Sequence, residues 1–143
     1  MKLRAKIQHE VLPLVYQLDE RGFNLVHIAV LLGVKGKVRA LIEAAVEFDK
    51  VSQDEVYRWV NSCTTTEQFT PLHLASFKSN IDAIETLITY KADPHAKNIL
   101  GLNMLHVAAQ GDSAVSLYYF MEQGVDIDDK DQNGKSPLHW ATY

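Results

Sequence analysis

A chain of 143 residues, 47% hydrophobic and 22% charged, is long enough to bury a substantial core and is typical of a globular domain. The net charge of −4 argues against a nucleic-acid partner, because the only basic cluster is Lys2, Arg4 and Lys6. No apolar run is long enough to cross a membrane and no signal peptide is visible, so direct membrane insertion is not expected. The single cysteine, Cys63, excludes an intrachain disulfide and suits the reducing cytosol.

The first elements in chain order are irregular. Residues 2–12 predict a helix that stops near Pro13, as the outer helix of a partial leading repeat over residues 1–21. Residues 22–69 form a longer unit, in which Ser52 and Glu55 make a capping box for an inserted helix near residues 52–63. Its apolar stripe follows at helical spacing as Val56, Trp59, Val60 and Cys63. We expect this stripe to pack on the neighbouring outer helix; a custom binding surface is the alternative.

A six-residue motif then recurs at a fixed interval. Residues 70–75 (TPLHLA) return in degraded form at residues 103–108 (NMLHVA) and 136–141 (SPLHWA), 33 residues apart each time. A weaker copy lies 46 residues upstream, at residues 24–29. A period of this length predicts a stacked array, with repeats at 70–102 and 103–135 and a truncated last repeat at 136–143. Because that last repeat has no outer helix, we expect the chain to be an excerpt of a longer protein.

Each copy of the motif has the chemistry of a helix start. Thr70 and Ser136 are good N-caps, and Pro71 and Pro137 suit the first helical position, where a missing N–H costs nothing. Second helices are expected at about residues 82–90 and 114–123, where apolar side chains recur at helical spacing. The segments between units, closed by glycines such as Gly101, are expected to be extended fingers.

The motif resembles that of the ankyrin repeat, whose signature is T-P-L-H-x-A. This resemblance implies that residues 1–143 form a single all-α solenoid of helix-turn-helix units with β-hairpin fingers. It also implies a protein-interaction module that binds a protein or peptide on its concave surface, made of fingers and inner helices. A rigid spacer without a specific ligand is the alternative from a different functional class.

The recurring histidines imitate a metal site. His27, His73, His106 and His139 occupy one position in successive units and should be separated by roughly 8–10 Å, the distance between packed helices. Zinc needs ligands converging at about 2 Å, so we interpret the histidines as a structural ladder that bonds the capping group and a neighbouring backbone. Residues 129–134 resemble half a calcium loop, but position twelve is Trp140 instead of a carboxylate. We expect no metal, no cofactor and no catalytic site.

Candidate partner contacts follow from large or apolar residues at solvent-facing positions. Ile99 and Leu100 lie at a fingertip, where polar residues are expected, although packing against an adjacent finger is an equal alternative. The other candidates belong to the inner helices: Phe77, Lys78, Gln110, Trp140 and Tyr143.

A narrower resemblance covers about the last 40 residues. Residues 105–112 (LHVAAQGD), 116–120 (SLYYF) and 136–142 (SPLHWAT) are similar to the ankyrin region of ankyrin-repeat palmitoyltransferases. The resemblance implies a cytosolic domain that recruits substrates for a membrane enzyme, and it nominates Trp140 as a contact. The catalytic Asp-His-His-Cys motif of that family does not occur in this sequence, so we expect no lipid transfer by this chain itself.

Overall fold

The computed structural model describes residues 19–141, so most of the expected leading repeat (residues 1–21) and Tyr143 lie outside the described residues. Within that range the regular structure is helical. The helices are α2 (Leu25–Leu32), α3 (Lys37–Asp49), α4 (Gln53–Val60), α5 (Pro71–Phe77), α6 (Ile81–Thr89), α7 (Met104–Gln110), α8 (Ala114–Glu122) and α9 (Pro137–Ala141).

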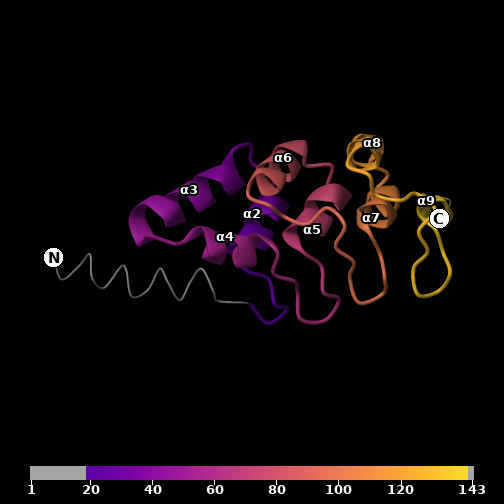
Figure 1. The fold of residues 1–143 in the computed structure, drawn as a ribbon, viewed down its shortest axis with the longest axis horizontal. Coiled ribbons are helices and arrows are strands. Elements are labelled where there is room, and N and C mark those ends of the chain that lie inside the picture. Colours follow the sequence, from indigo (N-terminus) through magenta and orange to yellow (C-terminus); the bar gives the residue numbers. More distant parts are fainter. Residues whose placement is uncertain (1–18, 142–143) are drawn as a thin grey trace.

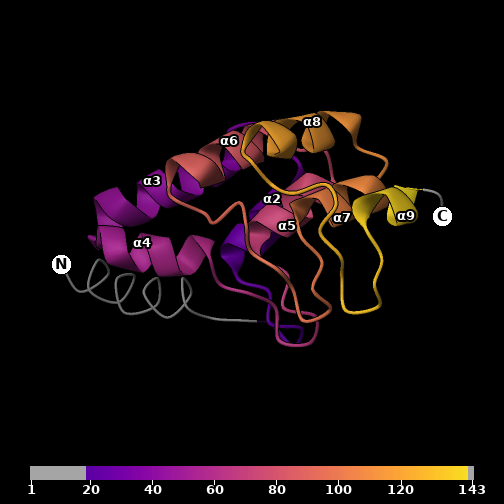
Figure 2. The same cartoon turned by 45° about the vertical axis from the view of Figure 1, so that its right-hand side comes forward.

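The helices form two layers (Figures 1 and 2). The inner layer contains α2, α5, α7 and α9 in that order, and each contacts the next along the row. The outer layer contains α3, α6 and α8, each packed on the inner helix that precedes it in the sequence. Fingers extend from the inner helices on the side away from the outer layer. None of the helices in residues 19–141 is long and apolar enough to cross a bilayer.

The inner helices begin alike because the same two side chains set each start. Asn24, Thr70 and Asn103 are N-caps whose side-chain oxygen accepts the backbone N–H of the histidine three residues on. That histidine returns the interaction through its ring to the backbone of the cap. The pair satisfies N–H groups that a helix start would otherwise leave unpaired, so the repeat motif fixes where each inner helix begins.

The turns between inner and outer helices share a left-handed residue. It is Gly33 in the first unit, Ser79 in the second and Asp112 in the third, with φ of 69°, 59° and 53°. Gly111 has an ordinary φ but no room, because a Cβ there would lie 2.2 Å from the backbone oxygen of Phe77. The glycine therefore permits the close approach of α7 to the end of α5.

The expected β-hairpin fingers are not confirmed, since residues 19–141 contain no β-strand. Each finger is instead a turn organised by one polar side chain. Asn98 Oδ1 accepts the backbone N–H groups of Leu100 and Leu102, and Asp131 Oδ1 does the same for Asn133 and Lys135. Two backbone bonds lie within each of these turns, as in Asn98 N to Leu102 O at 3.1 Å and Gly101 N to Asn98 O at 3.0 Å. A turn closed between residues 98 and 102 is too short to build a strand ladder.

Helix α4 follows α3 directly and is built into the core. Ser52 and Glu55 form its capping box, and Val56, Trp59 and Val60 are at most 4% exposed. The helix ends at Val60, so Cys63 lies beyond it and is exposed, contrary to the expectation that Cys63 belongs to the buried stripe. The side chain of Asn24, the cap of α2, donates to the carbonyl of Trp59 at 3.2 Å.

Candidate partner-binding surface

A row of equivalent residues crosses the ends of the inner helices. Gln110 follows Phe77 by 33 residues and Leu31 precedes Phe77 by 46, the same offsets that separate the capping motifs. Phe77 is 40% exposed at the end of α5, and Lys78 and Gln110 are exposed beside it. An aromatic ring left this open on a well-packed helix is available for contact with another molecule.

The sequence analysis missed two members of this surface on α2. Ile28 and Leu32 are 37% and 60% exposed, and residues four positions apart lie on one face of a helix. The upstream spacing could have identified Leu32, because it precedes Lys78 by the same 46 residues that separate Asn24 from Thr70. An apolar residue at a position occupied elsewhere by a lysine marks a solvent-facing site.

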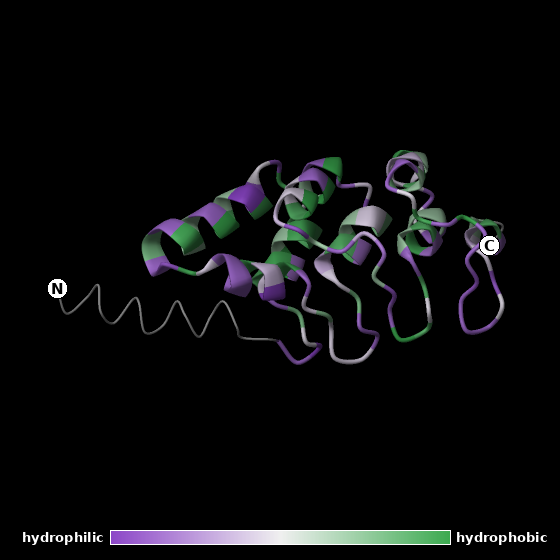
Figure 3. Cartoon of the chain, viewed as in Figure 1, coloured by the Kyte–Doolittle hydropathy of each residue, from purple (hydrophilic) through white to green (hydrophobic). Residues whose placement is uncertain are grey.

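The fingertip before α7 is apolar, and Figure 3 shows the contrast with the hydrophilic finger before α9. Ile99 and Leu100 are 47% and 42% exposed. Their backbone, in contrast, is tied to both neighbouring fingers. Ile99 N donates to Glu67 O at 3.2 Å, and Leu100 O accepts from Gln132 N at 2.9 Å. The neighbouring fingers thus fix the backbone while leaving the two aliphatic side chains open.

Trp140 on α9 is held against its own finger. Its indole Nε1–H donates to Asp131 Oδ2 at 2.8 Å, and the Lys135 ammonium lies 5.9 Å from the ring centroid. Burial alone would raise the pKa of the Asp131 carboxyl, but its hydrogen bonds from Lys135, Trp140 and Asn133 outweigh this and lower it. The ring is half-buried and fixed in place, whereas the neighbouring Leu138, which the sequence analysis did not select, is 70% exposed.

The histidine ladder has the same geometry in three units. Nε2 of His27, His73 and His106 faces the backbone carbonyl of Phe69, Leu102 and Lys135 respectively, at 2.9–3.2 Å. Nδ1 of each ring accepts the backbone N–H of the N-cap residue. A carbonyl oxygen accepts and an amide N–H donates, so these two contacts suit a ring that carries a proton on Nε2.

Burial lowers the pKa of two histidines of this ladder, which favours the neutral ring. It lowers the pKa of His27, and it lowers the pKa of His73 to about 4, against the opposing effect of the carbonyl hydrogen bonds. Each ring bonds the start of the following unit's inner helix or the finger leading to it. The histidines therefore connect successive units, and His139 repeats the bond to its own cap, Ser136, in α9.

The residues of the calcium-like segment are engaged in other contacts. The carboxylate of Asp129 pairs with the Lys97 ammonium at 2.7 Å, and both oxygens of Asp131 accept hydrogen bonds within their own finger and from Trp140. Across residues 19–141, no group of three or more His, Cys, Asp or Glu side chains is arranged to hold a metal ion.

Comparison with known proteins agrees with this architecture. A family model described as ankyrin repeats (3 copies) matches residues 7–98 and again residues 82–143. The putative palmitoyltransferase ZDHHC13 of Danio rerio is 28% identical over 127 residues, which is 89% of this chain and 18% of that protein. The palmitoyltransferase AKR1 of Lachancea kluyveri is 31% identical over 78 residues, covering 52% of this chain and 11% of that protein.

Inversin of Canis lupus familiaris is also similar, at 34% identity over 83 residues, or 56% of this chain and 8% of that protein. The chain thus spans less than a fifth of the length of each of these relatives. The family model matches most of this chain, residues 7–98 and 82–143. The chain belongs to the ankyrin-repeat family.

Proposed function

We propose that this chain is a protein-interaction module whose partner docks on the concave side, on what we call the finger surface. This surface consists of the fingertip residues Ile99 and Leu100 and the inner-helix residues Phe77, Lys78 and Gln110. Trp140 extends it at one end, and Ile28 and Leu32 extend it at the other. The remaining candidate contact, Tyr143, lies outside the described residues.

One observation carries the proposal: large apolar side chains are open to solvent where the backbone beneath them is rigidly held. Ile99 and Leu100 are each more than 40% exposed, yet hydrogen bonds to both neighbouring fingers hold their backbone. Burying such side chains against a partner removes apolar area from water without a large cost for ordering the loop. The same arrangement makes them good anchors for a peptide or a folded protein surface.

The most direct test compares two sets of exposed apolar residues in the full chain. One variant carries Phe77→Ser, Ile99→Ser and Leu100→Ser on the finger surface. The matched control carries Val115→Ser, Tyr118→Ser and Met121→Ser on α8, which are 57%, 70% and 48% exposed. We expect the finger variant to lose the partners that the wild-type chain captures from a lysate, and the control to keep them, with circular dichroism unchanged in both.

Loss of partners in the α8 control alone would place the interaction on the outer layer and overturn the proposal. Equal capture by all three proteins, or no capture at all, would support a rigid spacer without a specific ligand. The two serine sets remove similar apolar surface, so a nonspecific effect of lower hydrophobicity would appear in both.

A second candidate is substrate recruitment for a membrane-embedded palmitoyltransferase, with the repeats on the cytosolic face. The similarity to proteins named as palmitoyltransferases supports it, most broadly the Danio rerio relative, which aligns with 89% of this chain. In this hypothesis the chain contributes only recognition, and the lipid transfer belongs to residues outside the chain.

The native protein distinguishes the two candidates by size and fractionation. An antibody against this segment should detect a band much larger than 16.1 kDa, extracted from membranes only by detergent, if the chain belongs to a palmitoyltransferase. A band near that mass in the cytosolic fraction would exclude the recruitment hypothesis and leave a free-standing cytoplasmic adaptor.

A further inference from the structure

A hollow lies away from the finger surface, between α3, α4 and the end of α6. It has a volume of about 690 Å³, within the range of sites that hold small ligands or peptide side chains. We propose that this hollow, here called the α3–α4 groove, binds a short segment of a partner protein in which arginine alternates with aliphatic residues. The site acts independently of the finger surface.

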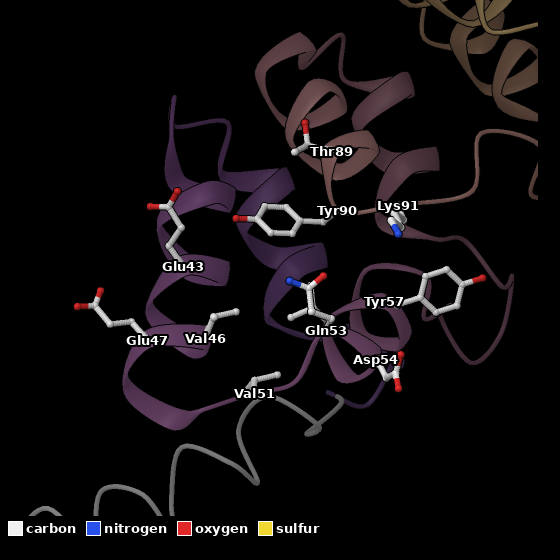
Figure 4. A pocket seen from close by; sticks show the side chains of 11 residues that line it. Glu43, Val46, Glu47, Val51, Gln53, Asp54, Tyr57, Thr89, Tyr90 and Lys91 are labelled. Atoms are coloured by element: carbon white, nitrogen blue, oxygen red, sulfur yellow. The ribbon is translucent and has the colours of Figure 1, made fainter.

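The groove exists because α4 is inserted after α3. Lys50, with φ of 55°, reverses the chain between these two helices, so that they diverge from a common end. In the following unit the chain passes from α6 directly into its finger, and the residues at that point, such as Tyr90, close the open side of the groove. Figure 4 shows the Tyr90 ring between the side chains of α3 and those of α4.

The floor and walls of the groove combine apolar surface with aromatic rings. Val51 and Val56 are 4% exposed at the base, while Val46 on α3 and Tyr57 on α4 remain 41% and 51% exposed. A ligand that covered Val46 and Tyr57 would gain from apolar burial. The Tyr57 and Tyr90 rings also offer faces on which a guanidinium group can stack.

The charged groups lining the groove are mostly acidic. Glu43, Glu47 and Asp54 supply three carboxylates against a single ammonium, that of Lys91. Glu43 is 4.0 Å from Arg39 in an exposed pair, whereas no ion pair with a described lysine or arginine is formed by Glu47 or Asp54. This excess of negative charge selects a cationic ligand and disfavours nucleic acid or an anionic lipid surface.

Arginine fits this combination better than lysine does. Its planar guanidinium can pair with a carboxylate through two parallel hydrogen bonds and can stack on a tyrosine at the same time. An exposed ion pair alone contributes little to binding, so the aliphatic neighbours of the arginine are needed to fill the space over Val46 and Tyr57. The ligand is therefore an alternating apolar and basic segment, and charge alone does not suffice.

The probe is a fluorescein-labelled hexapeptide, Ala-Leu-Arg-Leu-Arg-Ala, titrated with the full chain and followed by fluorescence anisotropy. We expect saturable binding that Glu47→Gln with Asp54→Asn weakens by roughly tenfold, the sum of two modest charge contributions. The matched control, Glu122→Gln with Asp128→Asn, removes the same charge from exposed positions outside the groove and should leave affinity unchanged. A peptide with serine in place of leucine should bind more weakly than the probe.

Methyl chemical shifts locate the peptide independently of any variant. We expect Val46, Val51 and Val56 to shift on titration while Ile99 and Leu100 do not, which separates this groove from the finger surface. Equal affinity of the groove variant and its control, or shifts confined to the fingertip, would overturn the proposal.

Two other occupants of the groove would also present basic and apolar side chains: the chain's own basic residues near its start, and a second copy of the chain. Each is distinguished from a partner protein by its own experiment. If Lys2→Gln, Arg4→Gln and Lys6→Gln together tighten peptide binding about tenfold or more, the chain's own basic residues compete for the groove, and a partner segment is not its occupant. If the chain self-associates with rising concentration and the groove variant abolishes this, the occupant is a second copy. Either result would contradict the assignment to a partner protein.

Discussion

The first unit stacks on the second through the same inner-helix contacts as the later units, but its outer helix and the connection after it are longer. Helices α5 and α7 have 7 residues each, and α6 and α8 have 9 each, so the second and third units are nearly superimposable in length. In the first unit the outer helix α3 has 13 residues and is followed by the 8-residue α4. The cap and histidine of α2 nevertheless match those of α5 and α7 in the capping bonds and in the contact from the histidine Nε2 to a backbone carbonyl.

This difference shows that stacking constrains the inner helix of a unit more than its outer helix. The inner helix and its cap fix the position of the next unit, because the histidine reaches across to the following chain segment. The outer helix and the connection to the finger each have only one face against the stack and the other toward solvent, so they can be extended without breaking the stack. The regular units therefore carry the apolar fingertip, and the extended unit carries the α3–α4 groove.

The largest expected change in the free energy of unfolding comes from Trp59, and it tests whether α4 is part of the hydrophobic core. Trp59→Ala should lower the free energy of unfolding by about 3–5 kcal/mol, because a side chain that is 3% exposed leaves a cavity. Trp59→Phe should cost about 1 kcal/mol, since the indole N–H has no hydrogen-bond partner in the described part of the chain and its loss is favourable. Urea unfolding of both variants measures this. A cost below about 1 kcal/mol for alanine would make α4 an appendage.

A second substitution tests close packing in the regular units. Gly111→Ala should destabilise by about 3 kcal/mol, because the new Cβ would overlap the backbone oxygen of Phe77. In the first unit, Gly36→Ala meets nothing within 4 Å and pays only for its φ of +76°, at about 1 kcal/mol. Thermal and urea unfolding should rank the two in this order, and equal costs would show that α5 and α7 do not approach as closely as described.

The pH dependence of stability tests the histidine ladder. In the unfolded chain His73 has a pKa near 6.5, and in the folded chain it is about 4, so the unfolded state binds more protons between these values. Stability is therefore complete above about pH 6.5 and falls by roughly 3 kcal/mol as the pH decreases to about 4. The lowered pKa of His27 adds a loss in the same direction from the first unit.

The measurement is urea unfolding at several pH values for the wild type and for His73→Gln. The variant should be less stable near neutral pH, because Leu102 O loses its donor, and its stability should depend less on pH in this interval. An unchanged pH slope in the variant would mean that His73 does not titrate across the unfolding transition.

The smallest expected effect concerns the turns between the layers. Asp112→Gly should raise the free energy of unfolding by about 0.5–1 kcal/mol, since an aspartate at φ of 53° is strained and a glycine is not. The first unit already has Gly33 at this position, so Gly33→Asp should cost a similar amount. Opposite signs in the two units would confirm that the turn is equivalent in both, and equal signs would contradict it.

The sequence predicted the repeat family and its all-helical architecture because both depend on local chemistry. The 33-residue period, the N-cap residues and the histidine at the third helical position are read directly from the chain. The capping box at Ser52 predicts a helix in the insertion, and the structure has α4 from Gln53 to Val60. The β-hairpin expectation rested on the turn residues between units and on the family resemblance, and short turns built on Asn98 and Asp131 replace it.

The surfaces were less predictable, because exposure depends on which neighbours arrive in space. The sequence nominates Ile99 and Leu100 by their position in a turn, but not the bonds to Glu67 and Gln132 that hold them. It gives no sign that Asp131 fixes the Trp140 ring. The α3–α4 groove joins three separate segments, residues 43–47, 51–57 and 89–91, and no local pattern connects them.

Site-specific photo-crosslinking tests the central claim, the finger surface, most directly. A benzoylphenylalanine side chain replaces either Leu100, on the apolar fingertip, or Tyr118, 70% exposed on α8, in otherwise identical full chains. Irradiation in a lysate of the source organism should yield one discrete adduct from the position of Leu100 and none from that of Tyr118. An adduct from the position of Tyr118 alone would contradict the account and place the partner on the outer layer.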